Sequence, residues 1–156
     1  MNFKQYILSL NETFGIPTDK PILIILTGGI ASGKSTAYKQ YFSEMPILDI
    51  DLLTKGDFSK QTKKSIILQN KTEKEISGKN SLVYTKTGAF PEKILLNIRL
   101  AKQKGMKTAV IFVDTPLKQA LQNNIDRTNN GDWHLIPEND IIKTNKLSKE
   151  NFKIYI

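Results

Sequence analysis

The chain has 156 residues, the length of one domain with room for a substantial hydrophobic core. It contains no cysteine and one histidine, which excludes a disulfide framework, a thiolate metal site and a multi-histidine zinc site. With 39% hydrophobic and 24% charged residues, the composition is that of a globular protein rather than a disordered chain. We therefore expect a single domain over residues 1–156.

The chain is basic, with 23 Lys and Arg against 15 Asp and Glu and a formal net charge of +8. Arg99 and Arg127 are the only arginines, so nearly all of the positive charge is carried by lysine. A basic domain attracts phosphate-rich partners such as nucleic acids. A lysine- and asparagine-rich composition also follows from an AT-rich coding sequence, so the charge leaves both explanations open.

Neither a signal peptide nor a membrane span is expected. The first 15 residues alternate apolar with polar side chains and lack the continuous apolar stretch of a secretory signal. The longest apolar run, residues 22–26, is far shorter than the roughly 20 residues that a spanning helix needs. Together with the absence of cysteine, these features predict a soluble, cytoplasmic protein with no membrane partner.

The predicted elements begin with an amphipathic helix over 3–14, where apolar residues recur at three- and four-residue spacing. A continuous apolar run over 22–27, bounded by proline and glycine, predicts a strand buried on both faces. A glycine-rich turn over 28–33 then leads into a helix over 34–43. A second short strand is expected over 46–51.

The second half of the chain continues this alternation of strands and helices. The lysine-rich segment 59–80 has only one apolar group and is expected to be a mobile helix or lobe on the substrate side. Further strands are expected over 81–85, 108–113 and 152–156, helices over 91–104, 116–127 and 138–146, and a polar lid over 128–137. Five strands alternating with helices predict a three-layer α/β domain with a mostly parallel sheet.

The turn after the first strand carries the best-defined motif. Residues 28–35 fit G-x-x-x-x-G-K-[ST], the phosphate-binding loop, in its confirming setting between a strand and a helix. Glycines bring backbone N–H groups close to phosphate oxygens, and the helix start adds its positive dipole end. Lys34 would reach the β- and γ-phosphates of ATP and Ser35 would bind Mg²⁺. The expected nucleotide-binding residues are Gly28, Gly29, Ile30, Ala31, Ser32, Gly33, Lys34, Ser35 and Thr36.

Two carboxylates and an arginine are the candidates for the chemistry beyond phosphate binding. Asp49 and Asp51 end the second strand on one face, so both can approach the γ-phosphate. Either is a candidate general base and Asp49 a candidate Mg²⁺ ligand, while helix capping is the alternative for Asp51. Arg127 precedes the polar loop and is a candidate catalytic lid residue, with a helix-dipole role as its alternative.

From Ile22 onward, the order of motifs resembles the P-loop kinases that group phage-type polynucleotide 5′-hydroxyl kinases with zeta toxins and related AAA_33-like proteins. The segments that carry the resemblance are 28–36, 48–51, 85–88 with 91–93, 113–117, and Arg127 with Pro137. The resemblance implies a parallel sheet of order 2-3-1-4-5, with ATP and Mg²⁺ as cofactors. By position, it implies the same roles for Lys34, Ser35, the two aspartates and Arg127, and it adds Thr87 as a substrate contact.

The chain departs from this family at three positions. Lys86 stands where these kinases commonly carry an acidic residue, and Lys55 stands near the position of an arginine in polynucleotide kinases. His134 takes the place of a further cation in the lid. The departures concern the acceptor side, so Lys86 and Lys55 join Thr87 as candidate substrate residues.

These features predict an ATP- and Mg²⁺-dependent kinase that transfers the γ-phosphate to a nucleic-acid 5′-hydroxyl or a nucleotide-like acceptor. Three alternatives stay open. Within kinases, the acceptor would be a UDP-sugar, as the zeta-toxin resemblance implies, or a nucleoside monophosphate. Outside enzymes, the chain would be a catalytically impaired module that binds a nucleotide or a nucleic acid.

Overall fold

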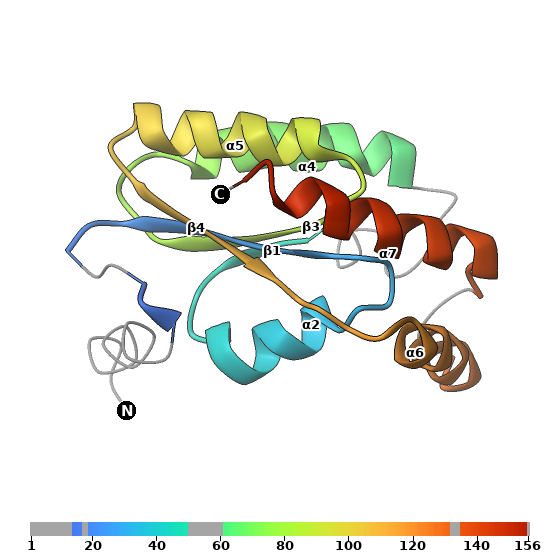
Figure 1. Cartoon of the computed structure of the whole chain (residues 1–156). Helices are drawn as coiled ribbons and strands as arrows, with labels where there is room; N and C mark the ends of the chain where they lie inside the picture. The colour runs from blue at the N-terminus through green and yellow to red at the C-terminus, as the bar shows by residue number, and fades with distance from the viewer. Residues whose placement is uncertain (1–13, 17–18, 50–60, 132–134, 156) are drawn as a thin grey trace.

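A parallel β-sheet forms the centre of the protein (Figure 1). The computed structural model describes residues 14–16, 19–49, 61–131 and 135–155. In this part of the chain the sheet has four strands in the order β2-β3-β1-β4, so the expected five-stranded sheet of order 2-3-1-4-5 is not confirmed. The strands are β1 (Ile22–Gly28), β2 (Ile47–Leu48), β3 (Leu82–Thr87) and β4 (Lys107–Phe112).

Helices cover both faces of this sheet (Figure 1). One face carries α2 (Lys34–Ala37), which continues as the π-helical segment η1 (Tyr38–Phe42). The other face carries α4 (Gln61–Glu75), α5 (Pro91–Gln103) and α7 (Glu138–Phe152). The remaining helix, α6 (Leu117–Asn129), lies beyond the carboxyl ends of the strands. This arrangement is the predicted three-layer α/β architecture.

Alternation along β1 builds two hydrophobic layers. Leu23 and Ile25 belong to a cluster that includes Ile94 of α5, whereas Ile24 and Leu26 belong to a second cluster that includes Phe42 of η1. All seven residues of β1 are buried, because β3 and β4 pair with its two edges and helices cover its two faces. The continuous apolar run in the sequence is therefore the signature of a central parallel strand.

The strand expected over 152–156 is wrong. The helix expected to stop at residue 146 extends to Phe152, and a turn follows. Phe152 packs on Phe112 of β4 with ring centroids 5.1 Å apart, so its side chain attaches the end of the helix to the sheet. The buried face of α7 includes the polar Asn145 and Ser148, and hydrophobic periodicity therefore underestimated the length of this helix.

Other predicted boundaries differ in smaller ways. The helix expected over 34–43 is divided into α2 and η1. The lysine-rich segment contains α4, whose Leu68 is buried in the core. The N-terminal helix lies outside the described residues except for Phe14, whose ring stacks on Phe42 at 5.6 Å.

No helix in the described part of the chain combines the length and the apolar character that crossing a bilayer requires.

Candidate active site

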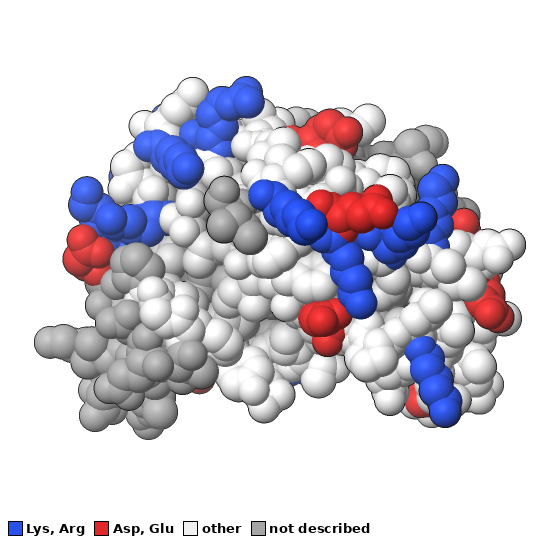
Figure 2. Space-filling model, viewed as in Figure 1, with Lys and Arg blue, Asp and Glu red and all other residues white. Residues whose placement is uncertain are grey.

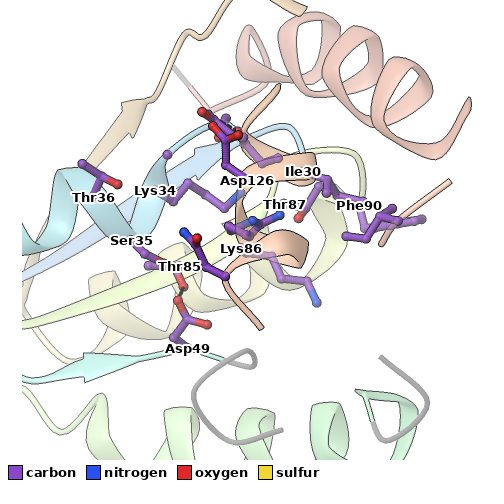
Figure 3. A pocket seen from close by; sticks show the side chains of 17 residues that line it. Ile30, Lys34, Ser35, Thr36, Asp49, Thr85, Lys86, Thr87, Phe90 and Asp126 are labelled. Atoms are coloured by element: carbon purple, nitrogen blue, oxygen red, sulfur yellow. Dashed lines mark hydrogen bonds between the residues drawn. The ribbon is translucent and has the colours of Figure 1, made fainter. Parts of the chain in front are cut away.

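A cavity of about 370 Å³ opens at the carboxyl ends of the strands, where open α/β sheets bind their ligands (Figure 3). The phosphate-binding loop and the start of α2 form one wall, the ends of β2 and β3 a second, and α6 a third. The cavity is lined by residues 30–36, Asp49, Thr85, Lys86, Thr87, Phe90, Asn123, Asp126, Arg127, Asn130 and Ile136. Segments from both halves of the chain therefore meet at one site.

At two positions of the loop the structure shows why the residue must be glycine. Gly33 precedes α2 with φ of +90°, a left-handed conformation that side chains rarely adopt. A Cβ atom at Gly29 would lie 2.5 Å from the side-chain amide of Asn145 in α7. The loop can therefore pack against α7 only because Gly29 has no side chain.

Side chains of α7 hydrogen-bond the loop from outside the cavity. The hydroxyl of Thr144 accepts a hydrogen bond from the backbone N–H of Ile30 at 3.2 Å. The amide of Asn145 donates to the carbonyl of Ile30 at 3.5 Å and to the carbonyl of Ile141 at 3.0 Å. These polar side chains fix the backbone at the middle of the phosphate-binding loop.

Two further side chains hold the carbonyl groups of the loop. Asn123 of α6 donates to the carbonyl of Ala31 at 2.9 Å, and the Thr115 hydroxyl donates to the carbonyl of Ser32. Hydrogen bonds that fix the carbonyls also orient the peptide units of the loop. A binding loop that is ordered in advance loses less conformational entropy when a ligand binds.

Lys34 lies across this loop. Its ammonium group donates a hydrogen bond to the carbonyl of Gly29 at 2.8 Å, and its side chain lines the cavity beside Ser35 (Figure 3). A positive charge, a hydroxyl and the start of a helix therefore meet at one end of the cavity. This combination suits a polyphosphate.

A buried carboxylate faces the same end of the cavity. Asp49 directly follows β2 and is only 5% exposed. The Thr85 hydroxyl donates a hydrogen bond to Oδ2 of Asp49 at 2.6 Å (Figure 3). The contact follows from the strand register, because Leu48 pairs with Tyr84 and the next residues of the two strands come side by side. A hydrogen bond to a carboxylate is stronger than one between neutral groups.

Tyr84 lies behind this carboxylate, in the core cluster beneath α4 and α5. Burial raises the pKa of its hydroxyl well above the usual range, the hydrogen bond with Asn97 lowers it, and the charge of Asp49 raises it further. Tyr84 therefore stays protonated at neutral pH and is not a candidate base.

The donor set fits Mg²⁺ bound together with a nucleotide. No group of three His, Asp or Glu side chains in the described part of the chain could hold a metal ion by itself. Ser35 and Asp49 nevertheless line the same cavity beside the phosphate-binding loop. Mg²⁺ is usually held by one or two protein oxygens together with substrate phosphates and water.

Comparison with protein families places these observations in context. The family model described as "AAA domain", AAA_33, matches residues 23–144. The chain belongs to the AAA_33 family. It is thus a member of the P-loop kinase group of polynucleotide kinases and zeta toxins, as the sequence resemblance implied. Among curated proteins, none matches the sequence at a significant level.

Solved structures share the fold of this AAA_33 domain. A chain in the Pnkp1/Rnl/Hen1 RNA repair complex has a TM-score of 0.68 at 15% identity, covering 90% of this chain and 48% of that one. A chain of AvrRxo1-ORF1:-ORF2 with ATP has a TM-score of 0.67 at 20% identity, covering 97% and 54%. A chain of the PezAT toxin–antitoxin system of Streptococcus pneumoniae has a TM-score of 0.61 at 14% identity, covering 99% and 75%. This chain spans about half the length of the first two.

Most predicted site residues of the AAA_33 domain meet at this cavity. It is lined by Ile30, Ala31, Ser32, Gly33, Lys34, Ser35, Thr36, Asp49, Lys86, Thr87 and Arg127. Gly28 and Gly29 form the base of the loop rather than the cavity wall. Asp51, Lys55 and His134 lie outside the described residues. The substrate-side role expected for the lysine-rich segment 59–80 stays a prediction.

Sequence reasoning missed a polar face of α6. Asn123, Asp126 and Asn130 line the cavity together with Arg127, because three- and four-residue spacing places them on one side of the helix. The same spacing is visible in the sequence and could have found them. Thr85 was also missed. It lies on the same face of β3 as the apolar Val83, and its hydroxyl marks the point where this face turns from apolar to polar.

The predicted lid begins on α6 and ends at Pro137, just before α7. Thr128 and Asn129 belong to this helix, whereas residues 132–134 lie outside the described part of the chain. The amide of Asn124 donates to the carbonyl of Ile136 at 2.9 Å and accepts from its N–H at 3.2 Å. This pair of hydrogen bonds ties the end of the predicted lid back to the helix that carries Arg127.

Proposed function

We propose that this AAA_33 domain is an ATP- and Mg²⁺-dependent kinase that transfers the γ-phosphate to a nucleic-acid 5′-hydroxyl or a nucleotide-like acceptor. One observation carries the proposal: a phosphate-binding loop, a buried carboxylate and an arginine from α6 line a single cavity. A neighbour of the same fold has a structure with ATP, which supports the choice of nucleotide.

The loop supplies binding and charge. Its backbone N–H groups bind the phosphates of ATP, and Lys34 neutralises charge at the β- and γ-phosphates. Ser35 and Asp49 would hold Mg²⁺, which when bound neutralises charge on the same phosphates. Arg127 adds a planar guanidinium that matches phosphate oxygens better than a lysine does, and it approaches from α6 on another wall of the cavity.

The two aspartates, Asp49 and Asp51, have different roles in this proposal. Asp49 is buried and bonded to Thr85, which suits a metal ligand with a fixed orientation. We assign to Asp51, two residues later in the sequence, the role of general base that accepts the proton of the acceptor hydroxyl. Positioning and charge stabilisation then provide most of the rate enhancement.

The acceptor would bind at the end of the cavity lined by Lys86, Thr87 and Phe90. The ring of Phe90 is 59% exposed and offers a surface on which a base can stack. Lys86 supplies a positive charge for an acceptor phosphate. Figure 2 shows basic side chains scattered among acidic ones on the side of the molecule in view, without one continuous basic patch there.

An acceptor screen with γ-labelled ATP tests this proposal. The candidate acceptors are 5′-hydroxyl oligonucleotides, nucleosides, nucleoside monophosphates and a UDP-sugar. We expect label transfer to one of these classes, and a loss of about a hundred-fold or more in the Lys34→Ala variant, because the cation at the transferring phosphate is removed. Lys71→Ala is the matched control, since Lys71 is exposed on α4 away from the cavity.

Two results would contradict the kinase. One is undiminished transfer by the Lys34→Ala variant. The other is ATP binding without transfer to any acceptor, which would favour the nucleotide-binding module instead. For a positive acceptor, salt dependence then separates the classes, because a nucleic acid releases counterions on binding and a UDP-sugar does not do so to the same degree.

A further inference from the structure

We propose that Thr85 is a positioning residue that orients Asp49 for Mg²⁺ bound with ATP. The inference rests on the proposed function, because it concerns the metal that this function requires. It starts from the 2.6 Å hydrogen bond between the Thr85 hydroxyl and Oδ2 of Asp49. Both side chains line the cavity together with Ser35.

The sheet brings these two residues onto one face. Ile47 and Val83 pair across β2 and β3, and both pack in the hydrophobic cluster that includes Phe42 of η1. Side chains two residues further along each strand return to the same face. Asp49 and Thr85 therefore continue this layer toward the carboxyl end of the sheet, the face that α2 and its Ser35 cover.

Burial makes the hydrogen bond important. Thr85 is 3% exposed and Asp49 is 5% exposed, so little water reaches the contact. A buried carboxylate requires hydrogen-bond partners, and a partner on one oxygen also fixes the orientation of the carboxylate plane. A metal ligand whose orientation is fixed by a neighbouring hydrogen bond binds more tightly than one that must be ordered during binding.

The residue type is what such a role requires. Valine has nearly the shape of threonine and fits a buried strand as well, so packing alone does not call for a hydroxyl at this position. The other hydroxyl of the strand on this face, Thr87, also lines the cavity. The hydroxyls begin where the apolar layer ends and the cavity starts.

The test compares the affinity for ATP with Mg²⁺ and with EDTA, measured by equilibrium binding. In the wild-type protein we expect Mg²⁺ to strengthen ATP binding. In Thr85→Val we expect this enhancement to fall by about ten-fold, the lower end of the 10- to 100-fold cost of losing such an outer partner. The affinity in EDTA should stay within about two-fold, because the phosphate-binding loop is untouched.

Two variants control this measurement. Thr85→Ser keeps a hydroxyl and should restore most of the Mg²⁺ enhancement. Thr72→Val removes another fully buried threonine hydroxyl, which donates to the carbonyl of Leu68 within α4 at 2.7 Å, and should leave the enhancement unchanged. If circular dichroism shows that Thr85→Val does not fold, Thr85→Cys replaces it, because a thiol is only a weak donor and the same fall is expected.

An equal Mg²⁺ enhancement in the wild type and in the folded variant without the hydroxyl would overturn the inference. So would a wild-type protein whose ATP affinity does not respond to Mg²⁺. Failure of the kinase proposal is distinguishable from these outcomes. A protein that phosphorylates no acceptor, yet loses its Mg²⁺-dependent ATP binding in Thr85→Val, contradicts the kinase and supports the role of Thr85.

Discussion

The two ends of the cavity differ in how firmly they are held. At the phosphate end, side chains from α6, α7 and the segment after β4 hydrogen-bond the backbone of the loop. At the acceptor end, Phe90 presents an exposed ring just before α5, where a polar capping residue is usual. An ordered phosphate end suits a ligand whose shape does not vary, and an open acceptor end allows substrate choice by single side chains.

This difference predicts two kinds of variant. Changes at the phosphate end should disturb a network and weaken ATP binding as a whole. Changes at the acceptor end should act on the acceptor and leave ATP unaffected. The ionisation of Tyr155, which follows the end of α7, should instead change the stability of the fold at high pH.

The largest of the remaining effects is expected for Gly29→Ala. The added Cβ would meet the Asn145 amide at 2.5 Å, and Asn145 is itself held by the carbonyl of Ile141. Overpacking of this kind costs about 1–3 kcal/mol, so ATP affinity should fall about ten-fold or more. Isothermal titration with ATP measures the change.

A second-site variant sharpens this prediction. Gly29→Ala combined with Asn145→Ala should recover part of the affinity, because the clashing amide is gone. Gly105→Ala lies away from the cavity, where the added Cβ meets no atom and only strains a backbone with φ of +76°, so it should lower stability and leave ATP affinity unchanged. Equal ATP affinity of Gly29→Ala and the wild type would show that the contacts of α7 do not constrain the loop.

A smaller, more selective effect is expected for Phe90→Ala. Stacking of a base on an aromatic ring contributes about 1–3 kcal/mol, so the KM for the acceptor should rise about ten-fold. The KM for ATP should not change, because the side chains that hydrogen-bond the backbone of the phosphate-binding loop are those of Thr144, Asn123 and Thr115. Steady-state kinetics with the acceptor found in the screen measure both values.

Phe90→Trp and Ile66→Ala are the controls for this variant. Tryptophan keeps an aromatic surface and should retain acceptor binding, and Ile66 is an equally exposed apolar residue on α4 outside the cavity. If Phe90→Ala raises the KM values for ATP and acceptor together, the comparison between the two ends is wrong.

The smallest effect concerns stability at high pH. Burial, with a smaller contribution from the charge of Glu92, raises the pKa of Tyr155 from 10.0 to about 12. The folded protein thus favours the protonated phenol, so this stabilisation is fully present below pH 10 and is lost as the pH rises toward 12. The melting temperature should fall over this range, and it should fall less in Tyr155→Phe. An identical pH dependence in the two proteins would contradict the assignment to Tyr155.

Much of the site was predictable because it follows from local sequence. The loop, Asp49 and the cavity-facing Lys86 and Thr87 come from motifs and strand ends, and parallel strands bring their carboxyl ends to one edge. Arg127 was predictable from its place before a polar loop. Thr85 and Asn123 were not predicted, because each acts through a hydrogen bond to a residue far away in the sequence.

The sequence by itself determined the phosphate-binding loop and the four strands of the sheet. These features depend on short-range chemistry: glycines before Lys34, and apolar runs bounded by glycine and proline. Only the tertiary structure decided the length of α7 and its hydrogen bonds to the loop. Its buried face is polar except for Ile141, and Thr144 lies 114 residues from its partner Ile30, so neither hydrophobic periodicity nor local spacing predicts the contact.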